Sequence, residues 1–297
     1  MNVDRRAVIK GLAAASALAV APEMAAARER RTAPPDAVGM LYDTTRCIGC
    51  KACVVACKEA NGLPPDTTGY GGGLYDAPQG LDELTKNVIQ LAQGENGSSF
   101  VKKQCMHCVD PACVNACMIG ALQKREYGIV TWDANRCIGC RYCEMACSFN
   151  VPKFQWSKRA PKIVKCEMCN HRLAEGRIPA CCEVCPRQAV IFGPYTELLD
   201  EAHRRLAEHP GRYIPKVFGE RELGGTQVLY LSHVPFEELG FAFHDERPIP
   251  ERQRTIQHGL YQGFAVPAAL YAVLGAVMLR NRKKNQAEAT GEPPEAG

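Results

Sequence analysis

The sequence predicts a loop-rich α+β protein with duplicated cysteine-rich modules and one C-terminal helix that crosses a membrane. Three observations predict this arrangement. Sixteen of the seventeen cysteines fall into four closely spaced quartets. The segment Arg46-Cys-Ile-Gly-Cys-Lys-Ala-Cys53 recurs as Arg136-Cys-Ile-Gly-Cys-Arg-Tyr-Cys143, which indicates an internal duplication. Near the end of the chain, residues 259–279 are almost free of charge.

The spacing within the quartets is typical of iron–sulfur ligands. The first and third read C-x2-C-x2-C-x3-C, the spacing by which bacterial ferredoxins hold their clusters. The second widens one gap to four residues, and the fourth widens one to eleven. Gaps of two residues let the chain turn back after each ligand, so that three thiolates surround one cluster. The sequence therefore predicts four [4Fe–4S] clusters, with iron as the metal, in two bacterial-ferredoxin-like lobes.

The fourth cysteine of each run ligates the other cluster in two-cluster ferredoxins. We expect the same crossing here. The first and fourth motifs then form an outer lobe, the second and third form an inner lobe, and Cys182 is left as a packing residue. The expected ligands are Cys47, Cys50, Cys53 and Cys185 for cluster 1; Cys166, Cys169, Cys181 and Cys57 for cluster 2; Cys105, Cys108, Cys113 and Cys147 for cluster 3; and Cys137, Cys140, Cys143 and Cys117 for cluster 4.

Three other uses of cysteine fit the pattern less well. Structural zinc sites favour two separated CxxC pairs over runs of three or four cysteines. A disulfide framework suits short secreted chains, whereas a chain of 297 residues can bury a hydrophobic core without disulfide bonds. Thioredoxin-type chemistry would need a single CxxC. The chain also lacks a Ser-His-Asp arrangement, a Rossmann fingerprint and an HExxH motif. We therefore expect no catalytic residue, and an electron carrier that is not an enzyme by itself.

Residues 1–27 have the features of a twin-arginine signal peptide. Arg5 and Arg6 precede a mildly apolar stretch over 11–21, and Ala25-Ala26-Ala27 offers a cleavage site. An ordinary secretory signal and a chance basic N-terminus are the alternatives. Twin-arginine export moves folded proteins, which suits a chain that must acquire clusters before export.

The apolar segment 259–279 predicts a single transmembrane helix. At about 1.5 Å per residue it spans roughly 30 Å, the hydrocarbon thickness of a bilayer. The basic residues that follow it should keep the C-terminus in the cytoplasm; they are Arg280, Arg282, Lys283 and Lys284. We expect a linker over 251–258 and a disordered cytoplasmic tail over 280–297. A buried amphipathic helix is the alternative, but no polar face recurs at helical spacing.

The four-cluster domain is expected over 28–250, with an inserted loop at about 58–100 that holds a short helix at Leu81–Leu91. Short strands are expected at Gly128–Trp132, Gln188–Phe192 and Thr226–Leu231. An amphipathic helix is expected over Tyr195–Glu208.

Positive side chains crowd the cysteines, although the net charge is only +4. Nearby cations favour the reduced form of an anionic cluster. Solvated lysines on loops are the alternative interpretation, and His107 is interpreted as a loop residue in preference to a donor to a cluster sulfur. The cations are Lys51, Lys58, Lys102, Lys103, Arg141 and Lys165.

Several segments besides the quartets resemble a known family, the iron–sulfur subunits of the dimethyl sulfoxide reductase type. Within it, the export signal and terminal anchor resemble the membrane-anchored subunits of periplasmic nickel–iron hydrogenases of the hydrogenase-2 kind. A departure is that only the fourth quartet keeps the proline after its last cysteine. The matching segments include Gly39-Met-Leu-Tyr-Asp43, Lys102-Lys-Gln-Cys-Met-His-Cys-Val-Asp-Pro111, Lys165-Cys-Glu-Met-Cys-Asn170, Glu183-Val-Cys-Pro186 and Gly224-Gly-Thr-Gln-Val-Leu229.

The resemblance implies an electron-transfer subunit at the periplasmic face of the bacterial inner membrane. Electrons from hydrogen oxidation in the hydrogenase large and small subunits would pass through the four clusters. An integral membrane subunit would then use them to reduce quinone. No nucleic acid and no small-molecule substrate of its own are expected. The alternative partner is a periplasmic formate dehydrogenase or another molybdoenzyme. An alternative from a different class of protein is a membrane-tethered zinc protein or assembly scaffold.

Overall fold

The computed structural model describes residues 31–66, 77–159, 161–241, 245–251 and 270–282. The chain divides into two compact units. One comprises Met1–Glu29 with Glu251–Gly297, and the other is Arg30–Pro250, which contains every cysteine. Within the first unit, residues 270–282 are helical.

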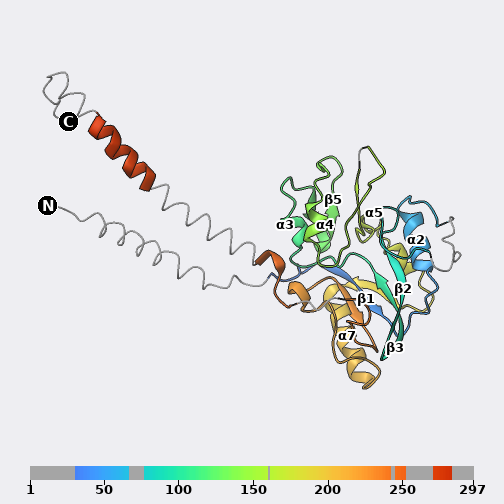
Figure 1. Cartoon of the computed structure of the whole chain (residues 1–297). Helices are drawn as coiled ribbons and strands as arrows, with labels where there is room; N and C mark the ends of the chain where they lie inside the picture. Colours follow the sequence, from blue (N-terminus) through green and yellow to red (C-terminus); the bar gives the residue numbers. More distant parts are fainter. Residues whose placement is uncertain (1–30, 67–76, 160, 242–244, 252–269, 283–297) are drawn as a thin grey trace, which may run out of the picture. The chain divides into compact units, whose positions relative to one another are not determined.

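A three-stranded sheet joins the beginning of the cysteine-rich unit to its end. Its central strand is β1, Val38–Asp43, which pairs antiparallel with β8, Val190–Pro194, and parallel with β9, Val228–Leu231. Helix α7, Tyr195–Glu208, follows β8 directly and packs Leu198 and Ala202 against the sheet. This layer lies beneath the cysteine-rich part of the body in the view of Figure 1.

A long hairpin occupies much of the expected inserted loop. Strands β2, Val88–Gly94, and β3, Gly97–Lys103, pair along their whole length. The short helix expected at Leu81–Leu91 is therefore wrong, and the loop ends before the hairpin begins. Asn96-Gly97 is a sequence that favours the tight turn between paired strands, and Val88, Ile89, Val101 and Lys102 are buried within the hairpin.

Short helices carry the cysteine motifs. Helix α2, Ala52–Ala60, packs against α6, Ala180–Glu183, and α3, Ala112–Asn115, packs against α4, Tyr142–Ala146. The first pair joins the first and fourth motifs, and the second pair joins the second and third. Helices α3 and α4 lie together on one side of the body, and α2 lies on the other (Figure 1).

Small elements complete the described body. Strand β4, Leu122–Lys124, pairs with β5, Val130–Trp132, and β6, Lys153–Phe154, pairs with β7, Ile163–Val164. The 3-10 turn η2, Glu126–Gly128, joins β4 to β5, helix α5, Asn170–Ala174, follows β7, and the 3-10 turn η3, Glu222–Gly224, precedes β9. The mixed, loop-rich character predicted from the sequence is confirmed, as are the bounds of α7. The three expected strands are present as β5, β8 and β9, and each begins two residues later than expected.

Both predicted membrane-related segments fall mostly outside the described residues. Residues 1–27 and 283–297 lie outside, as do positions 252–269, which hold the linker and the first half of the expected span. No helix within the described ranges reaches the length and apolar character needed to cross a bilayer. The transmembrane helix therefore stays a prediction.

Candidate metal centre

All seventeen cysteines lie in the described part of the chain, and all are free thiols. The four motifs share one backbone turn. In each, the residue just before the second cysteine adopts a positive φ, although only two of these residues are glycine. Because this turn reverses the chain, it brings successive cysteines of one motif round a common point. The residues are Gly49 (φ 71°), His107 (47°), Gly139 (71°) and Met168 (54°).

In the outer lobe, the first and fourth motifs meet between α2 and α6. Burial raises the pKa of the Cys53 thiol to about 12, and Cys181, Cys47 and Cys185 add to the rise. Burial likewise raises the pKa of Cys57 to about 12, with contributions from Cys181 and Cys169. Cys53 therefore lies near Cys47 and Cys185, which are expected ligands of the same cluster, cluster 1. Cys57 lies near Cys181 and Cys169, which are expected ligands of cluster 2, the cluster to which the crossing assigns Cys57.

The inner lobe repeats this pattern with the second and third motifs. Burial raises the pKa of Cys108, and the next contributions come from Cys105, Cys147 and Cys113. Burial raises the pKa of Cys143 to about 11, and the cysteines that add to this rise are Cys117, Cys137 and Cys140. The thiols that interact are those that the crossing places on clusters 3 and 4. The assignment of each cysteine to a cluster stays a prediction, and these neighbours support it.

Burial of the thiols limits which species they can bind. No three Cys, His, Asp or Glu side chains in the described ranges converge closely enough to hold one metal ion. A cubane differs from a single ion because each thiolate binds its own iron. The raised thiol pKa values mean that burial disfavours bare thiolates, so bound iron would have to supply the compensating positive charge.

The two lobes meet where Cys166 and Cys105 interact. The pKa of Cys166 is raised first by burial, then by Cys57 and by Cys105 of the other lobe. Cys105 and Cys166 also share one small apolar cluster with Val151. With the expected crossing, these contacts predict that clusters 2 and 3 lie at the centre, in the order 1, 2, 3, 4 along the protein.

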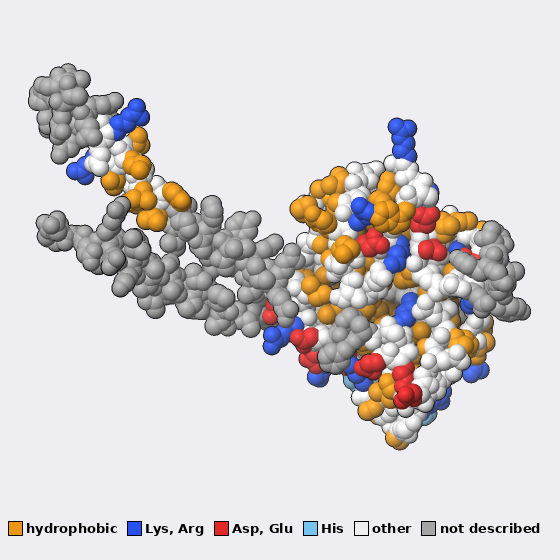
Figure 2. All heavy atoms as spheres, viewed as in Figure 1, with side chains coloured by type: hydrophobic (Ala, Val, Ile, Leu, Met, Phe, Trp, Pro, Cys, Tyr) orange, Lys and Arg blue, Asp and Glu red, His pale blue; other side chains and the backbone are white. Residues whose placement is uncertain are grey.

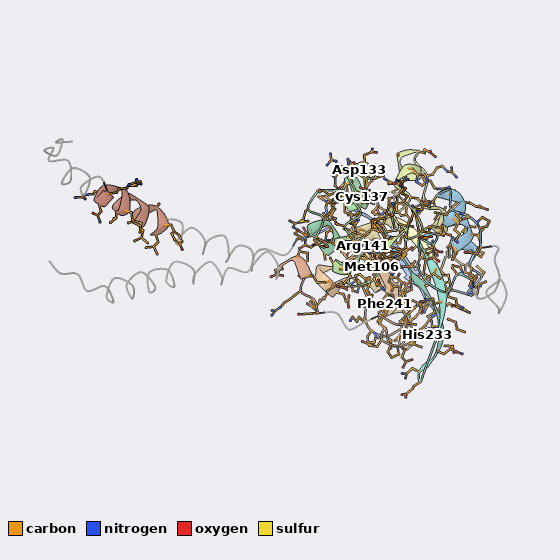
Figure 3. The ribbon with its side chains drawn as sticks, turned by 45° about the horizontal axis from the view of Figure 1, so that its top comes forward. Met106, Asp133, Cys137, Arg141, His233 and Phe241 are labelled. Carbon is orange, nitrogen blue, oxygen red and sulfur yellow. The ribbon has the colours of Figure 1, made fainter. Side chains whose placement is uncertain are left out.

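The two ends of this order reach the surface. The exposed cysteines are Cys50, which is expected on cluster 1, and Cys140, which is expected on cluster 4. Cys137 and Arg141 of the third motif lie toward the same side of the body in Figure 3. The ligands assigned to clusters 2 and 3 are buried or only partly exposed.

Backbone N–H groups point at cysteine sulfurs at matching places in the motifs. The N–H of Gly49 donates to Cys47 Sγ at 3.4 Å, and that of Met168 donates to Cys166 Sγ at 3.3 Å. After the fourth cysteine, Ala121 and Ala189 donate to Cys117 and Cys185, each at 3.2 Å. Hydrogen bonds to a sulfur favour its thiolate form, which is the form that binds iron.

The contact between the adjacent thiols of Cys181 and Cys182 shifts their pKa values in opposite directions. A hydrogen bond from Cys182 is the main reason that the pKa of Cys181 falls to about 6, and Lys102 contributes further. The same contact raises the pKa of Cys182, as does burial. The contact therefore lowers the thiol pKa of Cys181 and raises that of Cys182, which favours Cys181 as the ligand.

Two buried lysines stand beside the thiols without a carboxylate partner among the described residues. Lys102 is fully buried and its Nζ contacts the Gln104 side chain. Burial lowers its pKa, but Cys181, Cys53 and Cys166 outweigh burial, so the pKa is raised. Lys165 is 2% exposed, and its Nζ donates to the carbonyl oxygens of Val130 and Cys166. A buried charge is costly unless compensated, and an anionic cluster would compensate both, so these residues fit [4Fe–4S] clusters.

His107 is fully buried in its turn, and its Nε2 has no hydrogen-bond partner among the described residues. Its Nδ1 accepts the Val130 N–H at 3.1 Å, and burial followed by Lys165 and Lys124 holds its pKa well below the usual range. A Cβ at the equivalent positions, Gly49 and Gly139, would meet the rings of Phe100 and Phe154.

Two family models match the cysteine-rich unit, and both are described as 4Fe-4S dicluster domains. One covers residues 39–118 and the other covers residues 97–195. Two dicluster domains imply four [4Fe–4S] clusters, as the spacing of the quartets predicts.

The chain is also similar to several curated proteins. It is 40% identical to the hydrogenase-2 operon protein HybA of Escherichia coli O157:H7, over 95% of this chain and 97% of the relative. It is 38% identical to the iron–sulfur subunit of the nitrate-inducible formate dehydrogenase of E. coli K12, over 66% and 68%. The formate dehydrogenase iron–sulfur subunit of Haemophilus influenzae is 35% identical, over 78% and 73%. By its four cysteine motifs and by this similarity, the chain belongs to the family of iron–sulfur proteins that includes HybA.

Proposed function

We propose that this chain is the electron-transfer subunit of a hydrogenase-2-type complex. It would carry electrons from a periplasmic nickel–iron hydrogenase to an integral membrane subunit that reduces quinone. The observation that carries the proposal is the continuous series of neighbouring thiols from the first motif, through Cys166 and Cys105, to the third. When bound, each cluster would accept and release one electron.

The protein's own residues provide the path and its insulation. The cysteines of clusters 2 and 3 are held inside the body by β1, α2 and α6 on one side and by α3 and α4 on the other. Burial keeps water and oxidants away from them, while the exposed Cys50 and Cys140 bring the two end clusters to the surface. Donors and acceptors would therefore exchange electrons at the ends.

An apolar surface beside the expected cluster 4 supports contact with a partner subunit. Met118, Ile138 and Met145 all belong to the inner motifs and are 76%, 67% and 85% exposed. Figure 2 shows hydrophobic side chains gathered over the part of the body where Figure 1 places α3 and α4. Such patches on a monomer are typical of protein interfaces.

The membrane-related segments belong to the same proposal. Residues 1–27 would direct folded protein across the inner membrane, and 259–279 would anchor it with the body on the periplasmic side. Within the helical residues 270–282, Val273, Leu274, Met278 and Leu279 are exposed, which suits an apolar environment. Full-length protein should stay in membranes after an alkaline carbonate wash, and Leu274→Arg should release it. Extraction of the unaltered protein by carbonate would contradict the anchor.

The formate dehydrogenase alternative rests on a weaker likeness. The relatives of that kind are matched over 66–78% of this chain, whereas the HybA relative is matched over 95%. The test is to purify the tagged chain anaerobically from its native host and identify the bound subunits. A nickel–iron hydrogenase should co-purify, and hydrogen should reduce the visible absorbance of the clusters. Reduction by formate but not by hydrogen, with a molybdoenzyme bound, would overturn the hydrogenase assignment.

A further inference from the structure

We propose that the indole N–H of Trp132 donates a hydrogen bond to a sulfur of cluster 4 and raises the reduction potential of that cluster. The inference rests on the proposed function, because it needs the inner-lobe cysteines to hold clusters. It gives β5, a strand without cysteines, a part in setting the potential at one end of the series.

Strand β5 places the Trp132 side chain on the side of the expected cluster 4. Trp132 and Val130 are two residues apart, so their side chains lie on the same face of the strand. Val130 is buried in an apolar cluster of the inner lobe, and Trp132 packs against that cluster. It also gathers four cysteines, three of which are expected ligands of cluster 4. These three are Cys117, Cys137 and Cys143, and the other is Cys113.

The pairing of β5 with β4 brings Trp132 near Cys117. Trp132 lies opposite Leu122 in the register of the two strands, and side chains of directly opposed residues lie on the same face. The N–H of Leu122 donates to Cys117 Sγ at 3.5 Å. The indole ring and the Cys117 sulfur therefore flank the same residue, Leu122.

The backbone around Trp132 is held on both sides. The N–H of Trp132 donates to Glu167 Oε1 at 2.9 Å, and the N–H of Asp133 donates to the Ala121 carbonyl oxygen at 2.8 Å. Asp133 and Cys137 lie toward the same side of the body in Figure 3. The ring therefore stands on a fixed backbone just before the third motif.

The indole nitrogen of Trp132 is buried and has no hydrogen-bond partner among the described residues. Part of the ring lines a hollow beside Leu173 and Ala174, but solvent does not reach Nε1, so this nitrogen lies on the covered part of the ring. Buried N–H groups almost always have a partner, because an unsatisfied donor loses its hydrogen bond to water without replacement. An acceptor is therefore expected beside Nε1.

The other buried polar atoms without a partner in the described ranges lead less far. Two are the hydroxyls of Thr85 and Ser99, and one is the amide oxygen of Asn87; each can accept a hydrogen bond. The fourth is Nε2 of His107, whose imidazole donates or accepts according to its protonation. The indole N–H can only donate, so Trp132 requires an acceptor at every pH.

A bound cluster would supply that acceptor, because it brings sulfide ions and turns thiols into thiolates. Adding an electron to a four-thiolate cluster increases the negative charge on its sulfurs, so a hydrogen bond to a sulfur is stronger in the reduced state. Such hydrogen bonds are among the features that set the potential of a cluster. The Trp132 N–H therefore favours the reduced form of cluster 4.

The test compares Trp132→Phe with Trp156→Phe, because the chain contains only these two tryptophans. Phenylalanine removes the N–H but keeps an aromatic ring, which at the exposed position 156 still offers a face to Arg141. Purified full-length proteins are titrated anaerobically and followed by electron paramagnetic resonance. The component that is missing from Cys140→Ala marks cluster 4.

Trp132→Phe should lower the potential of the cluster 4 component by roughly threefold to tenfold in its one-electron equilibrium, where tenfold is about 59 mV. Trp156→Phe should leave that equilibrium within about twofold of the unaltered protein. An unshifted cluster 4 potential in cluster-loaded Trp132→Phe would overturn the proposal.

A direct measurement keeps the test decisive if Trp132→Phe does not load its clusters. Trp156→Phe is produced with ¹⁵N in its indole ring, so that Trp132 carries the only labelled indole. Pulsed electron paramagnetic resonance of the reduced cluster 4 component should then show a coupling to ¹⁵N. No coupling on that component would overturn the hydrogen bond and leave a buried water molecule as the partner of Nε1. If the unaltered protein lacks four titrating components, the proposed function itself fails, which is a separate result.

Discussion

The thiols of Cys105 and Cys166 interact across the boundary between the inner and outer lobes. They come from the second and fourth motifs and share an apolar cluster with Val151. This contact turns two separate cysteine-rich lobes into one series of four expected clusters. It also puts the exposed cysteines, Cys50 and Cys140, at opposite ends of that series.

The crossing of the fourth cysteines can be tested by comparing spectra of single variants. Cys57→Ala and Cys169→Ala should each lose the same resonance component, because both residues are expected on cluster 2. Cys53→Ala and Cys185→Ala should share a different lost component. Each protein should keep about 12 irons of the expected 16, provided that the other clusters assemble.

Cys182→Ala is the matched control for the crossing, since this thiol neighbours Cys181 but is expected to bind no iron. It should retain all four components. If Cys57→Ala instead loses the component missing from Cys53→Ala, each motif binds its own cluster and the crossing is wrong.

Gly49 should be essential for the first motif. Its φ is 71°, and a Cβ there would lie 2.4 Å from the Phe100 ring. Gly49→Ala therefore adds a steric clash to a backbone cost of roughly 1–2 kcal/mol. We expect loss of cluster 1 by iron analysis and a lower unfolding temperature.

Gly62→Ala controls for the backbone cost alone. Its φ is 60°, but nothing lies within 4 Å of the added Cβ. This variant should keep its full iron content. Equal iron loss in both variants would show that the Phe100 contact does not matter.

The ion pair that holds α7 on the sheet should be important for stability. Arg205 donates to Asp43 Oδ2 at 3.2 Å, and Asp43 has no exposed surface. Arg205→Met leaves a buried carboxylate with only part of its compensation, which typically costs about 3–5 kcal/mol. Denaturant unfolding of the cluster-loaded protein measures the change.

Arg204 offers the comparison one residue away on the same helix. It pairs with Glu201 and Glu208 on the exposed face, so Arg204→Met should leave the unfolding midpoint unchanged. A comparable loss of stability in both variants would contradict a special role for the Arg205–Asp43 pair.

The parts of the fold that could be predicted are those with a local cause. Helix α7 follows from its apolar spacing, and β8 and β9 follow from short β-branched runs between turn residues. The shared turns at Gly49 and Gly139 follow from the repeat. The cysteine spacing was enough to predict the number and kind of clusters.

The parts that were missed depend on contacts distant in sequence. The parallel pairing of β1 with β9 joins Met40 to Val228 and has no local signature. The β2–β3 hairpin was overlooked because its polar, glycine-containing context resembles a loop, although Asn96-Gly97 marked its turn. The difference between Lys102 and Lys103 has no local signal either, because only the packing of β3 shows that Lys102 is the buried one.

The central claim is that these thiols hold four [4Fe–4S] clusters that exchange single electrons. The most direct measurement is a coulometric titration of anaerobically purified protein, together with iron and sulfide analysis. The account predicts about 16 irons and 16 sulfides per chain and an uptake of about four electrons. Protein that carries zinc in place of iron, or that takes up fewer than four electrons with full iron content, would contradict it.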